Sequence, residues 1–162
     1  MIDDSDDAVI GVTLSGEIVS WNSSAERIFG YNAEEVNGLS YSVLISPEQP
    51  DFFLYILERI RKGEKIDHYE TVGVTRGKVQ IYLTMKIVPV RDSLGEVIGA
   101  SIIERDITEE QKAKEKIRKG KDFLKNLDEI NPAFFIAIDS SGSILSMNRT
   151  MLIALNYKLG EV

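Results

Sequence analysis

The sequence predicts an α+β fold in which short helices cover one face of an antiparallel sheet, followed by a long charged helix. Three observations favour this fold. Runs typical of β-strands lie near both ends of residues 1–107, amphipathic helical segments lie between those runs, and residues 108–130 are strongly charged. Such an order of elements is typical of an antiparallel sheet with its helices packed on one side.

Two short strands and two short helices open this domain. Residues 8–13 and 17–22 favour strands, and the Leu14-Ser15-Gly16 segment between them is typical of a hairpin turn. Asn22 is a good helix N-cap, and Gly30 ends the helix that follows it. The segment YNAEEVNG, residues 31–38, predicts one more helical turn.

A longer helix and three strands complete the domain. Residues 51–62 carry an apolar stripe at helical spacing, and Gly63 ends this helix. Residues 65–75 predict a strand, and residues 79–87 alternate between apolar and polar side chains, which is the period of a strand. After the turn RDSLGE, residues 97–104 predict the last strand.

The composition limits the partners and the chemistry that we expect. A formal net charge of -7 repels the phosphates of nucleic acids. No apolar run approaches the ~20 residues of a membrane span and no signal-peptide pattern opens the chain, so we expect a cytoplasmic protein without direct membrane contact. Cys is absent, and no catalytic or metal-ligating set is visible. The acidic opening segment MIDDSDD is interpreted as a solvated tail.

Residues 108–130 predict a helix that follows directly on the last strand. Thr108 is a candidate N-cap, and Gln111 is placed to complete a capping box. Gly120 occupies one position of a seven-residue repeat whose apolar members are Ala113, Ile117, Leu124 and Leu127. This spacing favours a two-helix coiled coil, and the alternative is a single solvated helix that lies on its own domain.

The end of the chain repeats its beginning. Shifted back by 126 positions, residues 131–162 match residues 5–36 without a gap, and the identical pairs include Ile10 with Ile136, Gly16 with Gly142 and Asn22 with Asn148. A second copy of the domain therefore begins near Asn131 and stops after a hairpin and a helix. A lone hairpin is marginally stable, so we expect its strands to pair with another chain or to cover an apolar face of the first domain.

Several motifs together resemble the PAS domain, also called the sensory-box domain. They are Gly-x-Ile-x-x-Trp-Asn at residues 16–22, Phe-Gly-Tyr at 29–31, Glu-Glu-Val-x-Gly at 34–38, Pro-x-x-Asp-x-x-Gly at 89–95 and Arg-Asp-Ile-Thr at 105–108. The resemblance implies three segments. These are a PAS domain over residues 1–107, a helical, coiled-coil-like linker over 108–130 and the first part of a second, truncated PAS domain over 131–162.

The resemblance also implies a fold and a role. PAS domains have a five-stranded antiparallel sheet whose helical flank encloses a small cavity, and they sense a ligand, a cofactor state or a partner. Tandem copies joined by a charged helix are typical of multi-PAS sensor histidine kinases, which belong to two-component systems. We therefore expect a non-catalytic input module with a downstream effector such as a kinase. We also expect a homodimer formed through residues 108–130, through the sheet, or through both.

In such proteins the Asp-Ile-Thr triad joins the last strand to the signalling helix. The resemblance therefore implies that Asp106 and Thr108 bond the backbone at this joint. We expect Arg105 to pair with Glu34 or Glu35 on the face of the domain. A stiff joint of this kind would turn a small movement of the sheet into a rotation or shift of the helix. The alternative is that Asp106 and Thr108 merely begin a well-capped helix.

A ligand pocket, if one exists, should be walled by the helix of residues 51–62 and by the strands that face it. The candidate pocket residues are Trp21, Asn22, Ile56, Ile60, Tyr69, Leu83, Met85 and Ile102. As core fillers, the same residues need no ligand.

The sequence identifies no cofactor, and we expect none. PAS subclasses that use a covalent flavin adduct or the yellow chromophore need a Cys, which this chain lacks. The haem subclass uses a His on the long helix, whereas His68 follows that helix. A non-covalent flavin stays open, because Trp21 could stack on its ring and Asn22 could hydrogen-bond to it. The alternatives to a ligand-coupled sensor are thus a dimerisation domain without a ligand and a non-covalent flavin redox sensor.

Overall fold

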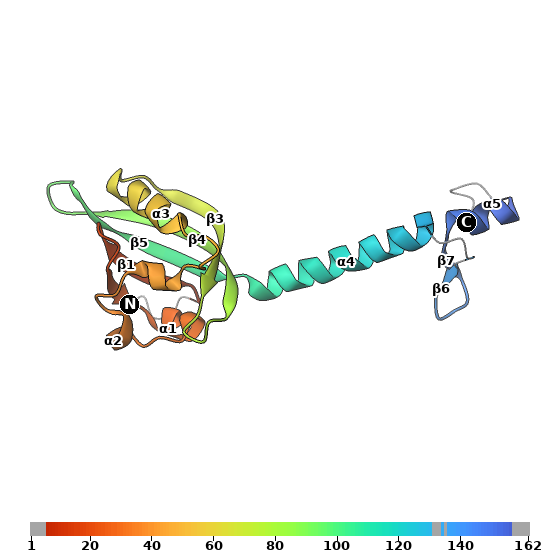
Figure 1. Cartoon of the computed structure of the whole chain (residues 1–162), viewed down its shortest axis with the longest axis horizontal. Coiled ribbons are helices and arrows are strands. Elements are labelled where there is room, and N and C mark those ends of the chain that lie inside the picture. Colours follow the sequence, from red (N-terminus) through yellow and green to blue (C-terminus); the bar gives the residue numbers. More distant parts are fainter. Residues whose placement is uncertain (1–5, 131–133, 135, 157–162) are drawn as a thin grey trace. The chain divides into compact units, whose positions relative to one another are not determined.

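The computed structural model describes residues 6–130, 134 and 136–156, and for residues 127–130 it describes the backbone alone. The chain divides into two compact units, Met1–Gln111 and Lys112–Val162. Figure 1 shows the elements of both units, coloured in chain order. None of the helices in the described ranges is long and apolar enough to cross a membrane.

The first unit is built on a five-stranded antiparallel sheet with the strand order β2-β1-β5-β4-β3, which confirms the predicted fold class. Its strands are β1 (Ala8–Thr13), β2 (Ile18–Trp21), β3 (Ile66–Val74), β4 (Gln80–Arg91) and β5 (Val97–Asp106). The last strand in the sequence, β5, lies in the centre of the sheet between β1 and β4. The strand that leads into the long helix is therefore held along both of its edges.

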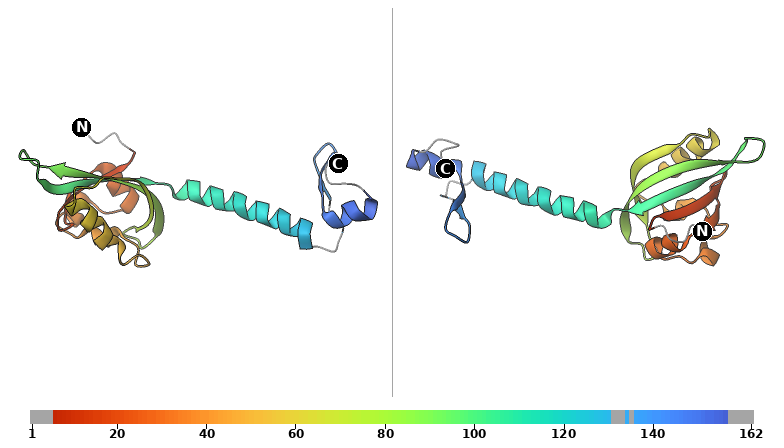
Figure 2. Two further views of the ribbon diagram at one scale, coloured as in Figure 1. Left: turned by 90° about the horizontal axis from the view of Figure 1, so that it is seen from above. Right: turned by 180° about the vertical axis from the view of Figure 1, so that it is seen from behind.

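Short helices cover one face of this sheet, as the two views of Figure 2 show. They are α1 (Ser23–Phe29), α2 (Ala33–Val36), the 3-10 helix η1 (Tyr41–Leu44) and α3 (Phe52–Arg61). The Asn22 side chain caps α1 by accepting a hydrogen bond from the Ala25 backbone N at 2.9 Å. Gly30 ends α1 with a φ of 77°, a left-handed conformation that favours glycine. The 3-10 helix η1 was not predicted from the sequence.

The hydrophobic core lies between these helices and the sheet. Alternate residues of β1 point inward, as the period of a strand requires, so that Ala8, Ile10 and Val12 are buried. The opposite wall comes from the helices, including Phe29 of α1 and Ile60 of α3. Burial of a large aliphatic or aromatic side chain stabilises the fold by roughly 1.5–3 kcal/mol. This core is therefore the main source of the first unit's stability.

The hairpin between β4 and β5 extends beyond the other strands of the sheet (Figure 1). Its turn is held by Asp92, whose Oδ1 accepts hydrogen bonds from the backbone N atoms of Leu94 at 2.9 Å and Glu96 at 3.0 Å. At the tip of the hairpin, Leu94 is 86% exposed. The turn RDSLGE thus forms a tight hairpin, as the sequence predicts.

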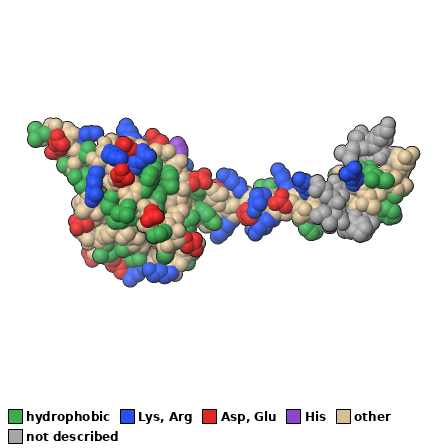
Figure 3. Space-filling model, turned by 45° about the horizontal axis from the view of Figure 1, so that its top comes forward, with side chains coloured by type: hydrophobic (Ala, Val, Ile, Leu, Met, Phe, Trp, Pro, Cys, Tyr) green, Lys and Arg blue, Asp and Glu red, His purple; other side chains and the backbone are tan. Residues whose placement is uncertain are grey.

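Helix α4 (Thr108–Ile130) follows β5 and confirms the predicted long C-terminal helix. The helix continues through Gly120 without a break. Lysine, arginine and acidic side chains lie along the face of this helix that Figure 3 shows, and Arg118 pairs with Glu115 at 2.8 Å. Ile117 and Leu124 of the seven-residue repeat are 61% and 57% exposed in the single chain. The coiled coil stays a prediction, since it needs a second helix.

In the second unit, a hairpin and a helix repeat the opening of the first. The strands β6 (Ile136–Ile138) and β7 (Ile144–Met147) pair antiparallel, and α5 (Arg149–Leu155) follows them. Ile136 lies opposite Met147, as Ile10 lies opposite Trp21. The register shifts between Ala137 and Ile138 in the second hairpin, at the position that matches the shift between Gly11 and Val12 in the first. Residues 131–133, 135 and 157–162 of the predicted second copy lie outside the described residues.

Candidate functional site

The joint between β5 and α4 is a single residue long. The Asp106 carboxylate accepts a hydrogen bond from the Thr108 backbone N at 2.9 Å. The Thr108 hydroxyl accepts one from the Tyr82 backbone N at 3.0 Å, and the Ile107 backbone N donates to the Tyr82 carbonyl at 2.9 Å. The beginning of α4 is therefore hydrogen-bonded to β4 as well as joined to β5. The relay role of Asp106 and Thr108 stays a prediction.

The predicted capping box at this joint is wrong. Thr108 is the first residue of α4, and its hydroxyl is bound to the backbone of β4. The Gln111 side chain does not turn back to the N-cap but donates to the Glu70 carboxylate of β3 at 3.3 Å. The sequence alone did not reveal this, because β4 and β3, which hold these bonding partners, lie far from Thr108 along the chain. The first turn of α4 consequently contacts both β4 and β3.

Arg105 pairs with Asp7, and the predicted pairing with Glu34 or Glu35 is wrong. Its Nε lies 2.8 Å from Asp7 Oδ1, and its terminal Nη2 lies 3.2 Å from Oδ2. The register of β1 against β5 explains this, since Ala8 lies opposite Glu104 and the residues next to them meet on the outer face of the sheet. Asp7 therefore belongs to the fold, although the sequence analysis assigned it to a solvated tail.

The two acidic residues of α2 make other contacts. Glu35 pairs with Arg76 at 2.7 Å and accepts a hydrogen bond from the Asn32 backbone N at 2.9 Å. Glu34 is exposed and lines a shallow depression of about 380 Å³ between β2 and α2. Neither residue contacts the β5–α4 joint through a described hydrogen bond or ion pair, so the structure offers no contact that supports a relay role for them.

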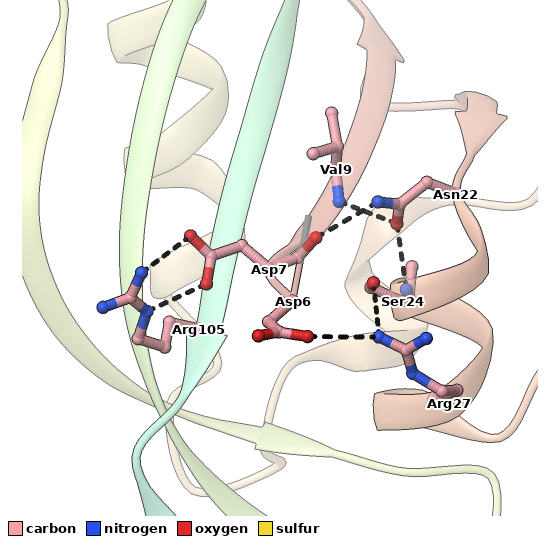
Figure 4. Close-up of polar contacts among 8 residues, drawn as sticks. Asp6, Asp7, Val9, Asn22, Ser24, Arg27 and Arg105 are labelled. Carbon is pink, nitrogen blue, oxygen red and sulfur yellow. Dashed lines mark hydrogen bonds and ion pairs between the residues drawn. The ribbon is translucent and has the colours of Figure 1, made fainter. Parts of the chain in front are cut away.

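Asn22 links the start of β1 to helix α1, as Figure 4 shows. Its Oδ1 accepts hydrogen bonds from the backbone N atoms of Val9 and Ala25, each at 2.9 Å. Its Nδ2 donates to the Asp7 carbonyl at 3.1 Å. Asp7 thus binds Arg105 through its carboxylate and Asn22 through its backbone. A continuous chain of polar contacts therefore runs from Arg105 through Asp7 and Asn22 to α1.

Five of the predicted pocket residues lie together in the core. They are Ile56 and Ile60 of α3, Leu83 and Met85 of β4, and Ile102 of β5. Each is at most 1% exposed. Their positions follow from helical spacing in α3 and from strand alternation in β4 and β5. Whether they line a ligand pocket stays a prediction, since buried apolar residues also serve as core.

The other predicted pocket residues lie at the edges of this cluster. The Trp21 indole packs against Phe29 with ring centroids 5.7 Å apart, and its Nε1 donates to the Tyr31 carbonyl at 3.0 Å. Tyr69 is 38% exposed and stacks on Phe52 with ring centroids 5.1 Å apart. Trp21 and Asn22, the two residues proposed to hold a flavin, are both engaged in hydrogen bonds of the fold.

A buried carboxyl, Glu104, faces the same core and was missed by the sequence analysis. It is 1% exposed, and the Tyr41 hydroxyl donates to its Oε1 at 2.6 Å. Burial raises the pKa of Glu104 to about 7, although the hydrogen bond from Tyr41 lowers it. Burial and the nearby Glu104 also raise the pKa of Tyr41 well above its ordinary value. Alternation along β5 places Glu104 on the same face as Ile102, and this signal was available in the sequence.

The described residues contain no group of three or more His, Asp or Glu side chains that could hold a metal ion. His68 lies in β3 at a register shift, is exposed and has a φ of 53°. Its position follows α3 and therefore agrees with the predicted placement beyond the long helix.

Two curated proteins are similar to this chain over about two thirds of its length. The signal transduction histidine-protein kinase AtoS of Escherichia coli (strain K12) is 30% identical over 108 residues, which cover 67% of this chain and 17% of that protein. Phytochrome B1 of Solanum lycopersicum is 27% identical over 108 residues, which cover 64% of this chain and 10% of that protein. The chain therefore spans only a small part of the length of these relatives.

Solved structures share the fold. The PAS domain of a protein from Colwellia psychrerythraea matches with a TM-score of 0.60 and 25% identity, covering 67% of this chain and 92% of that one. A domain of a sensory box sensor histidine kinase/response regulator from Geobacter sulfurreducens matches with a TM-score of 0.56 and 21% identity, covering 65% and 87%. A family model described as PAS domain matches residues 6–109. The chain belongs to the PAS domain family.

Proposed function

We propose that this chain is a sensory input module in which the PAS domain passes its conformational state to helix α4. Its natural setting is a longer multi-PAS sensor, with a histidine kinase as the downstream effector. The similarity to the sensor kinase AtoS and the fold shared with a sensory box histidine kinase domain support this setting. The module itself binds or senses, and the effector carries out the catalysis.

The observation that carries this proposal is the way in which α4 begins. The central strand β5 leads into α4 through Ile107 alone, and the neighbouring strand β4 bonds to both Ile107 and Thr108. If β5 slides against β4, these bonds therefore either break or move the first turn of α4. Discrete rearrangements of this kind are how sensor domains transmit small movements.

We also propose that residues 131–162 are the N-terminal part of a second PAS domain. The described bonds of the second hairpin support this assignment. The Gly142 backbone N donates to the Asp139 carbonyl, as the Gly16 backbone N donates to the Thr13 carbonyl. Gly142 has a φ of 87°, and Gly16 has a φ of 84°. Asn148 caps α5 by accepting from Met151 N at 3.2 Å, as Asn22 caps α1.

The second unit exposes the apolar residues that a complete PAS domain would bury. Ile136, Ile138 and Ile144 are 41%, 59% and 43% exposed. Their counterparts in the first unit, Ile10, Val12 and Ile18, are at most 3% exposed. We propose that further PAS strands or a second chain cover this surface, because isolated hairpins with exposed edges associate readily.

A homodimer through α4 is the second candidate role, and one observation favours it. Ile117, Phe123 and Leu124 are each more than half exposed on an otherwise charged helix. A coiled coil with a second copy would bury such side chains. Dimerisation is compatible with signalling, because a rotating joint can transmit its state through a paired helix. The flavin alternative gains no support, since Trp21 and Asn22 are engaged in bonds of the fold.

An exchange of domains tests the proposed function. The 108-residue segment of AtoS that aligns with this chain would be replaced by the matching segment of this chain, and autophosphorylation of the chimera would be measured. We expect an active kinase whose activity changes by several-fold when Asp106→Ala is introduced, since allosteric coupling of about 1–3 kcal/mol corresponds to such factors. A matched control is Asp92→Ala, which removes the same type of side chain-to-backbone bond from the far turn of β4 and β5. Equal activity of all three active chimeras would contradict the proposed relay.

A further inference from the structure

Glu104 is a carboxyl group in the core for which the described part of the chain provides only one hydrogen-bond donor. The Tyr41 hydroxyl donates to Oε1 at 2.6 Å, whereas Oε2 makes no hydrogen bond to any residue that the structure describes. Both side chains are at most 2% exposed. A buried carboxylate is costly unless its oxygens are paired, so this position favours the protonated, neutral form.

Among the residues that the structure describes, the surroundings of Glu104 supply no cation. On the sheet it lies between Ala8 of β1 and Met85 of β4, both buried. The inward residues of α3, which packs against β5, are apolar, and its charged residues Glu58, Arg59 and Arg61 lie toward solvent. Tyr41 of η1 is therefore the ionisable group that faces Glu104.

The charged residues next along these strands are engaged on the outer face of the sheet. Arg105 pairs with Asp7 at 2.8 Å, and Lys86 pairs with Asp67 at 3.2 Å. Because successive residues of a strand point to opposite faces, neither cation can approach Glu104 without a change of register. A charge on Glu104 thus meets one hydroxyl and an apolar core, and burial accordingly raises its pKa to about 7.

We propose that Glu104 and Tyr41 form a proton-binding site in the PAS core, through which pH near neutrality sets the conformation of the β5–α4 joint. The proton is then a signal for the sensor, so the inference rests on the proposed function. Loss of the proton places a charge on the inner face of β5, two residues before Asp106. The structure can relieve this charge by letting water reach Oε2, which requires β5 or η1 to move.

Movement of η1 is restricted on its other side. The Tyr41 backbone N donates to the Gly16 carbonyl at 2.8 Å, and this bond fixes η1 to the β1–β2 turn. The end of β5 has a different constraint, because beyond Glu104 it is held by bonds that also hold the first turn of α4. A displacement of β5 at Glu104 is therefore passed to Asp106 and Thr108. This is the physical link between the proton and the helix.

An NMR titration of the full chain between pH 5 and pH 8.5 tests the site, with the Glu carboxyl carbons and the backbone amides observed together. We expect the Glu104 carboxyl carbon to titrate with a midpoint near the value of about 7 that burial imposes. Tyr41→Phe should raise this midpoint, because it removes the donor that favours the charged form. A Glu104 midpoint near the ordinary value of 4.5 would overturn the proton site.

The same titration tests the coupling. We expect the amides of Ile107 and Gln111 to shift with the midpoint of Glu104 in the native chain and to lose this transition in Glu104→Gln. The matched control is Glu96→Gln, which removes an exposed carboxyl at the β4–β5 turn and should leave the transition unchanged. If Glu104→Gln fails to fold, Tyr41→Phe still tests the coupling, because the titration midpoints of the Ile107 and Gln111 amides should rise together with the midpoint of Glu104. Titration of Glu104 without any response of the joint would overturn the coupling. The proposed relay fails separately, when Asp106→Ala leaves the output of the chimera unchanged.

Discussion

The Arg105 guanidinium and the Asp7 carboxylate lie opposite each other at the ends of β5 and β1, with Nε 2.8 Å from Oδ1 and Nη2 3.2 Å from Oδ2. Two parallel contacts of this kind fix the orientation of both groups. Through Asn22 the same Asp7 is bonded to the first turn of α1. The last residues before α4 are thereby connected to the opening of the domain.

Asp7→Asn should weaken this connection while leaving the domain folded. We expect a small decrease in the urea midpoint of unfolding, and a smaller one in high salt, because the Arg105 side chain is 67% exposed and salt screens such contacts. A double-mutant cycle with Arg105→Gln is the check. In the Arg105→Gln background, Asp7→Asn should lower the urea midpoint by less than it does in the native chain. If the decreases in the urea midpoint caused by the two substitutions simply add, the two residues are not coupled.

The stability of the chain should depend on the protonation of Glu104. Its pKa in the folded chain, about 7, lies above the ordinary value of 4.5, so the folded state binds this proton more tightly than the unfolded state does. The stabilisation is fully present below pH 4.5 and is lost as the pH rises to about 7 and beyond. From this difference we expect a loss of roughly 3 kcal/mol, which urea unfolding at a series of pH values measures.

Glu104→Gln should remove this part of the pH dependence, because a neutral amide keeps the shape of the carboxyl without titrating. Glu96→Gln, at an exposed position, should retain it. The relevant quantity is the difference in the free energy of unfolding between pH 5 and pH 8 for each variant. The same pH dependence in both variants would assign the effect to other groups.

Core replacements should separate packing from a ligand pocket. Ile60 is fully buried in α3, whereas Leu54 on the same helix is 65% exposed. Ile60→Ala should lower the free energy of unfolding by about 2–5 kcal/mol, the usual cost of a cavity in a packed core. Leu54→Ala should change it little. A loss below about 1 kcal/mol for Ile60→Ala would indicate a site that is loosely packed, as the wall of a cavity is.

The assembly of the chain should depend on the apolar residues of α4. We expect the mass measured by sedimentation to rise with concentration toward that of a dimer. Ile117→Lys combined with Leu124→Lys should shift this equilibrium toward the monomer, because the coiled coil cannot bury those charges. Lys116→Glu, at an exposed charged position outside the seven-residue repeat, serves as the control. A monomer at all concentrations would contradict dimerisation through α4.

Local sequence signals were sufficient to predict most of the fold. Strand alternation located β4, and the caps Asn22 and Gly30 located α1, because these signals depend on residues close together in the chain. Pairings between distant segments were not predictable in this way. Arg105 was assigned to α2, although the register of β1 against β5 places Asp7 next to it. The whole sheet sets that register, so no short segment of the sequence predicts it.

The candidate site was predicted only in part for the same reason. The resemblance to PAS domains pointed to Asp106 and Thr108, whereas the donor to the Thr108 hydroxyl, the Tyr82 amide, becomes visible only when β4 lies beside β5. Glu104 was missed although alternation along β5 places it inward, since an acidic residue is rarely expected in a core. Buried polar residues of this kind are where a local analysis fails and where function is often found.

Hydrogen–deuterium exchange of the first turn of α4 tests the central claim most directly. Asp106→Ala should speed amide exchange at residues 108–111, because it lowers the local stability of this turn by about 1 kcal/mol as the loss of a cap does, and should leave exchange in β1 unchanged. Asp92→Ala, which removes the equivalent bond at the other end of β4 and β5, should leave residues 108–111 protected. Equal exchange of this turn in both variants would contradict the account that the β5–α4 joint ties the helix to the sheet.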